Sequence, residues 1–135
     1  MVIDGTPLYI DIKELHKLLY RAQFTMTKGD RIVMGDRLLD LNQNMIILLS
    51  RAVQANGKER VEWIEKLRGE FDALRLCFQT AADLTLFKEA RSTVDRNSGE
   101  RTNIGPLVLG IVERIDKIDK GIGKWRSATK ARIMP

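Results

Sequence analysis

The sequence contains few of the residues from which reactive or metal-binding sites are built. Its 135 residues include one cysteine, Cys77, and one histidine, His16. A single cysteine excludes an intramolecular disulfide, and the apolar helical context of Cys77 favours a small core residue over a reactive thiol. His16 has no cysteine or carboxylate at ligand spacing, which predicts a packed or surface histidine. We therefore expect no metal site and no cofactor.

Long apolar runs are absent as well. No run approaches the roughly 18 apolar residues that a membrane span needs, and residues 1–14 do not join a basic segment to an apolar one, as a secretion signal does. We expect no membrane contact and a cytoplasmic protein, in keeping with the single cysteine. Hydrophobic residues make up 44% and charged residues 30% of the chain. This balance is typical of one folded domain, here over residues 1–135.

Proline is scarce, and none lies between Thr27 and Asn56, a stretch with a polar start and with Asn56-Gly57 at its end. These features predict a helix, and Thr27 with Asp30 three residues later nearly matches a capping box at its start. Its apolar residues form two adjacent rows, which together are wide enough to contact several neighbours, so we expect the central rod of a helical bundle. One row comprises Leu38, Leu41, Met45, Leu48 and Ala52, and the other comprises Leu39, Ile46, Leu49 and Val53 with the polar Asn42.

Three further segments repeat the alternation of three- and four-residue steps between apolar side chains. The three stripes are Ile12, Leu15, Leu19, Ala22 and Met26, then Ile64, Leu67, Phe71, Leu74, Phe78 and Ala81, and finally Ile104, Val108, Ile111, Ile115, Ile118, Ile122 and Trp125. Because the turn after Asn56 is only two or three residues long, the helix that follows must run antiparallel to the one before it. The fold class is therefore all-α, an antiparallel up-down four-helix bundle. We predict helices over about 7–25, 28–56, 58–87 and 105–127, a polar loop over 88–103 and a basic tail over 127–135.

The last helix carries most of the net charge of the chain. The whole sequence has 23 lysines and arginines against 18 acidic residues, a net charge of +5. Between Glu113 and Arg132 there are seven basic and three acidic residues, so this segment alone contributes 7 − 3 = +4. Asp116 with Lys120, and Glu113 with Lys117, stand in the order that favours ion pairs within a helix. Two interpretations stay open: a solvated helix face, or an electrostatic footprint for phosphates.

We find no motif that indicates catalysis. No nucleophile has a plausible base, and the segment from Gly121 to Trp125 lacks the spacing of a phosphate-binding loop and interrupts a heptad seam. A small helical enzyme acting on an anionic metabolite is an alternative, but it would need arginines on stripes that are almost purely apolar. We therefore expect that the protein is not an enzyme.

Three stretches together resemble a known family. They are Phe24-Thr-Met-Thr-Lys-Gly-Asp-Arg31 followed by Met34-Gly-Asp-Arg-Leu38, then Glu70 to Leu84, then Gly121-Ile-Gly-Lys-Trp125. Their order and spacing resemble the four-helix bundle proteins related to those encoded in ribosomal RNA intervening sequences. Within this group, the length and the Gly-x-Trp ending are most similar to the accessory variability determinants (Avd) of diversity-generating retroelements. The chain departs from the pattern at Thr27, where the family has proline, and at Gln79, where it has arginine.

The resemblance implies a homopentameric barrel with a basic surface. It implies a non-catalytic protein that binds the retroelement reverse transcriptase together with template RNA and complementary DNA during mutagenic copying. An alternative is a bundle of the intervening-sequence type, with a structural or interaction role and no link to a retroelement. Ile47 lies outside both apolar rows of its helix and is the candidate for a subunit interface. The candidates for phosphate or partner contact are Arg31, Arg37, Arg75, Lys117, Lys120, Lys124, Arg126, Lys130 and Arg132.

Overall fold

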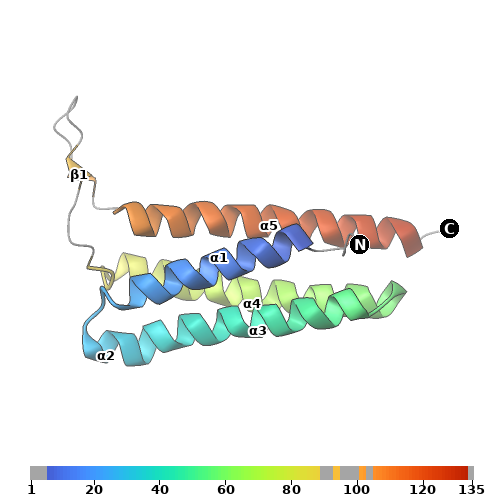
Figure 1. The fold of residues 1–135 in the computed structure, drawn as a ribbon, viewed down its shortest axis with the longest axis horizontal. Helices are drawn as coiled ribbons and strands as arrows, with labels where there is room; N and C mark the ends of the chain where they lie inside the picture. The colour runs from blue at the N-terminus through green and yellow to red at the C-terminus, as the bar shows by residue number, and fades with distance from the viewer. Residues whose placement is uncertain (1–5, 89–92, 95–100, 103–104, 134–135) are drawn as a thin grey trace.

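The computed structural model describes residues 6–88, 93–94, 101–102 and 105–133. Within them, four long helical rods lie side by side and alternate in direction (Figure 1). The rods are α1 (Thr6–Gln23), a continuous rod made of α2 (Lys28–Asp30), η1 (Arg31–Gly35) and α3 (Asp36–Gln54), then α4 (Gly57–Asp83) and α5 (Pro106–Ile133). The predicted all-helical bundle is confirmed.

The rods contact one another in a closed ring, in the order α1, α3, α4, α5 and back to α1. The rod that ends in α3 is therefore one of four equivalent corners, and its predicted place at the centre of the bundle is wrong. Its two apolar rows have a simpler explanation. A corner helix faces two neighbours, here α1 and α4, and therefore needs a wide apolar face. Leu38, Leu41, Asn42, Met45, Leu49 and Ala52 are buried, while Leu39, Ile46, Leu48 and Val53 are half-buried against the core.

The core follows the heptad stripes of the other helices. In α1 and α4 every residue of the predicted stripe is buried, and in α5 the stripe is buried from Ile111 to Trp125. Full burial of one such side chain stabilises the fold by about 1.5–3 kcal/mol. The α5 stripe also continues to Thr129, which is buried and donates its hydroxyl to the Trp125 carbonyl at 2.8 Å. Of the predicted stripe, Ile104 lies outside the described residues.

Several helix ends differ from the prediction. Helix α1 ends at Gln23 and α3 at Gln54, each two residues early, and α5 continues as a helix to Ile133. Residues 127–133 of the predicted basic tail over 127–135 thus belong to α5. The helix continues because Thr129 extends the buried stripe by one step and because no proline or glycine lies between Thr129 and Pro135. The turn after α3 uses Gly57, whose φ of 58° is the left-handed conformation that glycine favours.

Helix α4 ends at Asp83 instead of Phe87, in a turn that the sequence hides. The Leu86 amide donates to the Ala81 carbonyl at 3.0 Å, and the Thr85 amide donates to the Ala82 carbonyl at 3.0 Å. This is a Schellman motif, which requires a left-handed residue at the position of Thr85, where φ is 56°. Glycine normally marks that position, so a threonine there gave no stop signal. Leu86 and Phe87 still pack on the core after the turn, which prolongs the apolar pattern.

The start of the second rod has two local devices. Thr27 caps α2: its hydroxyl donates to the Asp30 carboxylate at 2.9 Å, and it accepts the Asp30 amide at 3.3 Å, which confirms the predicted capping pair. Directly after Asp30 the helix widens to the π-helical segment η1. Gly35 ends this segment, and a Cβ atom there would lie 3.1 Å from Cβ of Gln23, so the small residue allows η1 to approach α1 closely.

The predicted loop over 88–103 contains a short antiparallel pairing. β1 (Thr93–Val94) pairs with β2 (Arg101–Thr102), with Thr93 opposite Thr102 and Val94 opposite Arg101. The remainder of this predicted loop after Lys88 lies outside the described residues.

Candidate nucleic-acid interface

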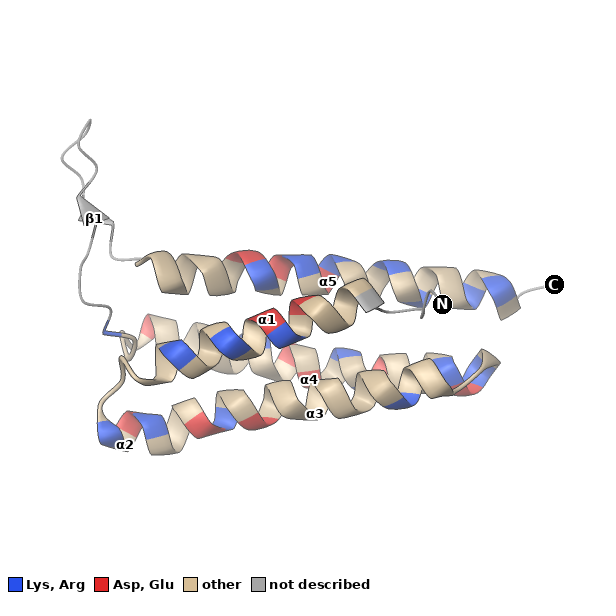
Figure 2. Ribbon diagram, in the orientation of Figure 1, with Lys and Arg blue, Asp and Glu red and all other residues tan. Residues whose placement is uncertain are grey.

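The outer face of α5 presents lysines to solvent. Lys117, Lys120 and Lys124 are all exposed, and they lie away from the buried stripe of the same helix. Lys120 pairs with Asp116 at 2.9 Å, as its spacing predicts. The second predicted pair does not form: no ion pair joins Glu113 to Lys117 within the described residues. Figure 2 shows that basic residues dominate the end of α5 nearest the C-terminus, beyond its last acidic residue.

The two edges of α5 are occupied by ion pairs to neighbouring helices. On the α1 side, Arg114 donates to Asp11 at 2.7 Å. On the α4 side, Arg126 pairs with Glu65, and Lys130 approaches the same carboxylate at 3.9 Å. Because Glu65 belongs to α4, Arg126 and Lys130 join α5 to α4. Their two positive charges share one carboxylate, so only the charge that Glu65 does not neutralise is available to a ligand.

Asp119 of α5 organises a second cluster on the α4 side. Arg68 donates to its carboxylate, and Arg75 lies 3.9 Å from the same group while also pairing with Asp72 at 3.2 Å. Arg75 therefore has two carboxylate neighbours. Its predicted role in phosphate contact would require it to exchange these partners, whereas Lys117 and Lys124 have no ion pair among the described residues.

The remaining predicted basic residues lie at other places on the bundle. Arg31 is half-buried in η1, and its guanidinium lies 5.0 Å from the centre of the Phe24 ring. Arg37 is exposed at the start of α3, and Arg132 is exposed at the far end of α5. Seven of the nine predicted residues thus lie on α5 or on the edge of α4 beside it. The other two, Arg31 and Arg37, lie at the start of the second rod. The structure does not bring the nine residues into a single site.

Arg37 has an electrostatic neighbour in α4. Burial raises the pKa of the Cys77 thiol, and the positive charge of Arg37 partly opposes that rise. Cys77 is half-buried against the core. A thiol with a raised pKa is mostly protonated at neutral pH and is a poor nucleophile. The structure agrees with the predicted packing role of this residue.

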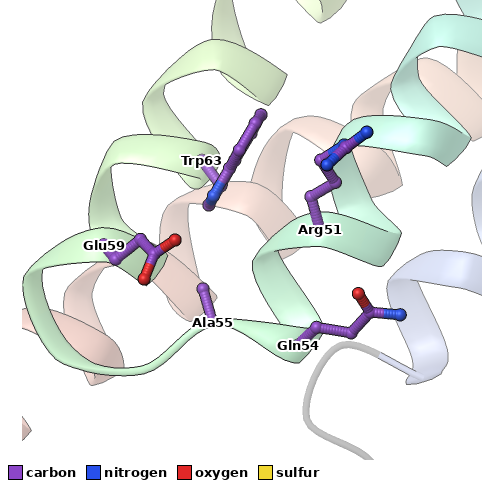
Figure 3. Close-up of a pocket in the computed structure, with 5 residues that line it drawn as sticks. All are labelled: Arg51, Gln54, Ala55, Glu59 and Trp63. Atoms are coloured by element: carbon purple, nitrogen blue, oxygen red, sulfur yellow. The ribbon is translucent and has the colours of Figure 1, made fainter.

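Three hollows lie near the turn between α3 and α4. One, of about 250 Å³, is lined by Arg51, Gln54, Ala55, Glu59 and Trp63. Figure 3 shows the Trp63 ring standing opposite Arg51 above Ala55, with Glu59 and Gln54 at the lower rim. The Arg51 guanidinium carbon lies 5.5 Å from the centre of the ring, and the Lys66 amine lies 4.4 Å from it. Because cations already flank this ring, Trp63 serves here to pack α4 against α3.

The other two hollows lie between the start of α4 and the end of α5. One has a volume of about 390 Å³ and contains Arg60 and Arg132, and the other has a volume of about 430 Å³ and contains Lys58 and Lys130. Arg60 is committed to the fold, since its guanidinium donates to the carbonyls of Ala52, Val53 and Ala55. These hollows extend the basic end of α5 toward α4.

The interior offers no charged site among the residues that the structure describes. The buried polar side chains there are Gln23, Asn42 and Thr129, and the arginines lie at the helix edges. The arginines that converge inside the bundle in the metabolite-enzyme alternative are therefore not seen in the described part of the chain. In the same part, no group of three histidine, cysteine or carboxylate side chains is placed to hold a metal ion. None of the described helices has the length and apolarity of a membrane span.

One feature of the surface was not predicted. Tyr9 and Tyr20 are exposed on α1 and Phe24 is exposed directly after it, and all three lie among lysines and arginines. Only the buried stripe of this helix was predicted. The sequence does indicate a second stripe, on the side of the helix away from the buried one. Steps of four, four, three and four residues connect Tyr9, Lys13, Lys17, Tyr20 and Phe24.

Comparison with protein-family models, with curated proteins and with solved structures finds no match to this chain.

Proposed function

We propose that this chain is a non-catalytic accessory protein of a diversity-generating retroelement, which binds template RNA and complementary DNA together with the reverse transcriptase. The order of the three family-like motifs supports the retroelement role. The nucleic-acid part rests chiefly on one observation. After Asp119, α5 has five basic residues and no acidic one, and its outer lysines are exposed.

Phosphate contact is the chemistry that this surface suits. Exposed lysines bind a polyphosphate backbone by releasing its condensed counterions, so their contribution is independent of sequence and decreases with salt. Lys117 and Lys124 are the best candidates, because neither has an ion pair within the described residues. Lys120, Arg126 and Lys130 can contribute through the charge that their partners leave uncompensated.

The proposal includes assembly into a homopentamer, as the resemblance implies. Ile47 supports a subunit contact because 49% of its surface is exposed on α3. Leu76 and Leu84 of the α4 region are also exposed apolar side chains that a neighbouring subunit would cover. Repetition of the α5 face around a ring would multiply a modest charge per chain into a strongly basic assembly.

The test measures binding of labelled template RNA at a series of salt concentrations. Replacing Lys117, Lys120 and Lys124 by glutamine should reduce the slope of log affinity against log salt by about 2, since each single-strand phosphate contact contributes roughly 0.7. The single variant Lys124→Gln should reduce the slope by about 0.7, and Lys66→Gln, which removes one exposed lysine from α4, is its control. No salt-dependent binding, alone or with the co-purified reverse transcriptase, would overturn the proposal. A strict monomer in sedimentation would overturn its pentameric part.

A further inference from the structure

The exposed aromatic side chains of this protein are concentrated on one helix. Of the eight aromatic residues in the sequence, Tyr9, Tyr20 and Phe24 are 41%, 52% and 54% exposed, and all of them belong to α1 or the residue that follows it. The other five are buried or half-buried in the bundle. These three rings stay exposed although α1 contacts α3, α5 and η1, and Arg31 of η1 lies over the Phe24 ring.

The rings alternate with cations along a single stripe. Steps of three and four residues place Tyr9, Lys13, Lys17, Tyr20 and Phe24 on one side of α1. This side lies away from the buried stripe that contains Ile12, Leu15 and Leu19. From Tyr9 to Phe24 the stripe is about 22 Å long at 1.5 Å per residue, which is comparable with the path of a few nucleotides.

Contacts between neighbours hold the stripe in order. The Lys13 amine lies 5.3 Å from the centre of the Tyr9 ring. The Tyr20 and Phe24 rings meet edge to face with their centres 5.0 Å apart, and the Arg31 guanidinium lies 5.0 Å from the centre of Phe24. The aromatic side chains are thus oriented before any ligand arrives, while about half of the surface of Tyr20 and Phe24 stays open to solvent.

The charge around the stripe is positive and its acidic residues are already engaged. Residues 6–31 contain five lysines and arginines and three acidic residues. Asp11 is paired with Arg114, Glu14 with Lys17 at 3.2 Å, and Asp30 with the Thr27 hydroxyl. Figure 2 shows basic residues recurring along α1 and at the start of the second rod. A ligand on this side therefore meets cations with few competing carboxylates.

We infer that this α1 stripe, defined by Tyr9, Lys13, Lys17, Tyr20 and Phe24, is a stacking track for single-stranded nucleic acid. Exposed rings alternating with cations match the two needs of an unpaired strand, a platform for each base and a positive group for each phosphate. Tyr20 and Phe24 receive bases, while Lys13 and Arg31 contact the backbone, as does Lys17 once it exchanges Glu14 for a phosphate. The track rests on the proposed function and adds to it a mode of binding separate from the charge of α5.

The experiment compares two pairs of substitutions in binding to a single-stranded 12-nucleotide RNA, to its DNA counterpart and to a duplex. Tyr20→Ala with Phe24→Ala should weaken single-strand binding at least about fivefold for each ring, with duplex binding and the salt slope unchanged. Tyr20→Phe with Phe24→Tyr retains both rings and should bind as the wild type does. Leu109→Ala with Val112→Ala removes exposed apolar surface near the start of α5 and is the matched control.

The outcomes separate the track from the broader proposal. Unchanged single-strand affinity in the alanine pair, with a loss on replacing the α5 lysines, would overturn the track and leave the proposed function in place. A changed molecular mass with unchanged affinity would assign the rings to a subunit contact and would also overturn the track. Absence of any nucleic-acid binding by the wild-type protein would overturn both.

Discussion

His16 of α1 and Asn42 of α3 form a hydrogen bond across the helix interface, with Nδ1 of the ring 3.0 Å from Oδ1 of the amide. Asn42 is fully buried, and its amide nitrogen has no partner among the described residues. A buried polar group inside an apolar seam costs stability, but it penalises every helix register that separates it from its partner. The pair therefore defines how α1 slides against α3.

A double-mutant cycle measures this pairing. His16→Ala and Asn42→Ala should show a coupling energy of about 1 kcal/mol in urea unfolding, the net value of one such hydrogen bond. The control cycle combines Asn42→Ala with Lys17→Ala in place of His16→Ala. Lys17 is the next residue of α1 and is exposed, so this cycle should show coupling near zero. Equal coupling in the two cycles would mean that the bond contributes nothing specific.

Thr85 offers a stabilising substitution. A β-branched residue with φ of 56° is strained in the Schellman turn that ends α4, and glycine removes that strain. We expect Thr85→Gly to raise the free energy of unfolding by about 1 kcal/mol, after allowing for the greater entropy of an unfolded glycine. Thermal unfolding followed by circular dichroism should show a higher midpoint.

Thr80→Gly is the matched control for this substitution. Thr80 is exposed in the last helical turn of α4, where glycine should cost about 1 kcal/mol relative to a better helix former. If both glycine variants lower the melting temperature, the left-handed turn at Thr85 is not a source of strain.

Arg60 closes the turn between α3 and α4. Its Nε donates to the Ala52 and Ala55 carbonyls at 3.0 and 2.9 Å, and Nη2 donates to the Val53 carbonyl at 3.0 Å. These carbonyls lie in the last turn of α3 and at its C-cap, where carbonyls lack the usual helical partners, although that of Ala52 also accepts the Ala55 amide at 3.3 Å. Arg60→Met keeps the aliphatic stem and removes the donors, so we expect a loss of about 2 kcal/mol in urea unfolding, since hydrogen bonds from charged groups exceed neutral ones.

Lys58→Met, two residues earlier on the exposed surface, is the control for Arg60→Met and should change stability by less than about 0.5 kcal/mol. Similar losses in both variants would show that general surface charge, and not the capping of α3, accounts for the effect.

The heptad stripes, the Thr27 cap and the Asn56-Gly57 turn were readable from the sequence by itself, because each depends on neighbours within one or two helical turns. The stripe of α4 from Ile64 to Ala81 is buried as predicted. Local periodicity therefore determined that the chain is a bundle of helices. It also identified the core side of each helix and showed that the charge excess lies on the last one.

Tertiary structure alone decided which charges remain available. Arg75 and Arg126 had the same sequence signature as Lys117 and Lys124, yet the first two meet carboxylates from elsewhere in the bundle and the second two do not. The reason is that Glu65 is 61 residues from Arg126, a separation that no periodicity links. The exposed rings of α1 have the same origin: a stripe of aromatics and lysines becomes a surface only when the remaining helices pack against the other sides of α1.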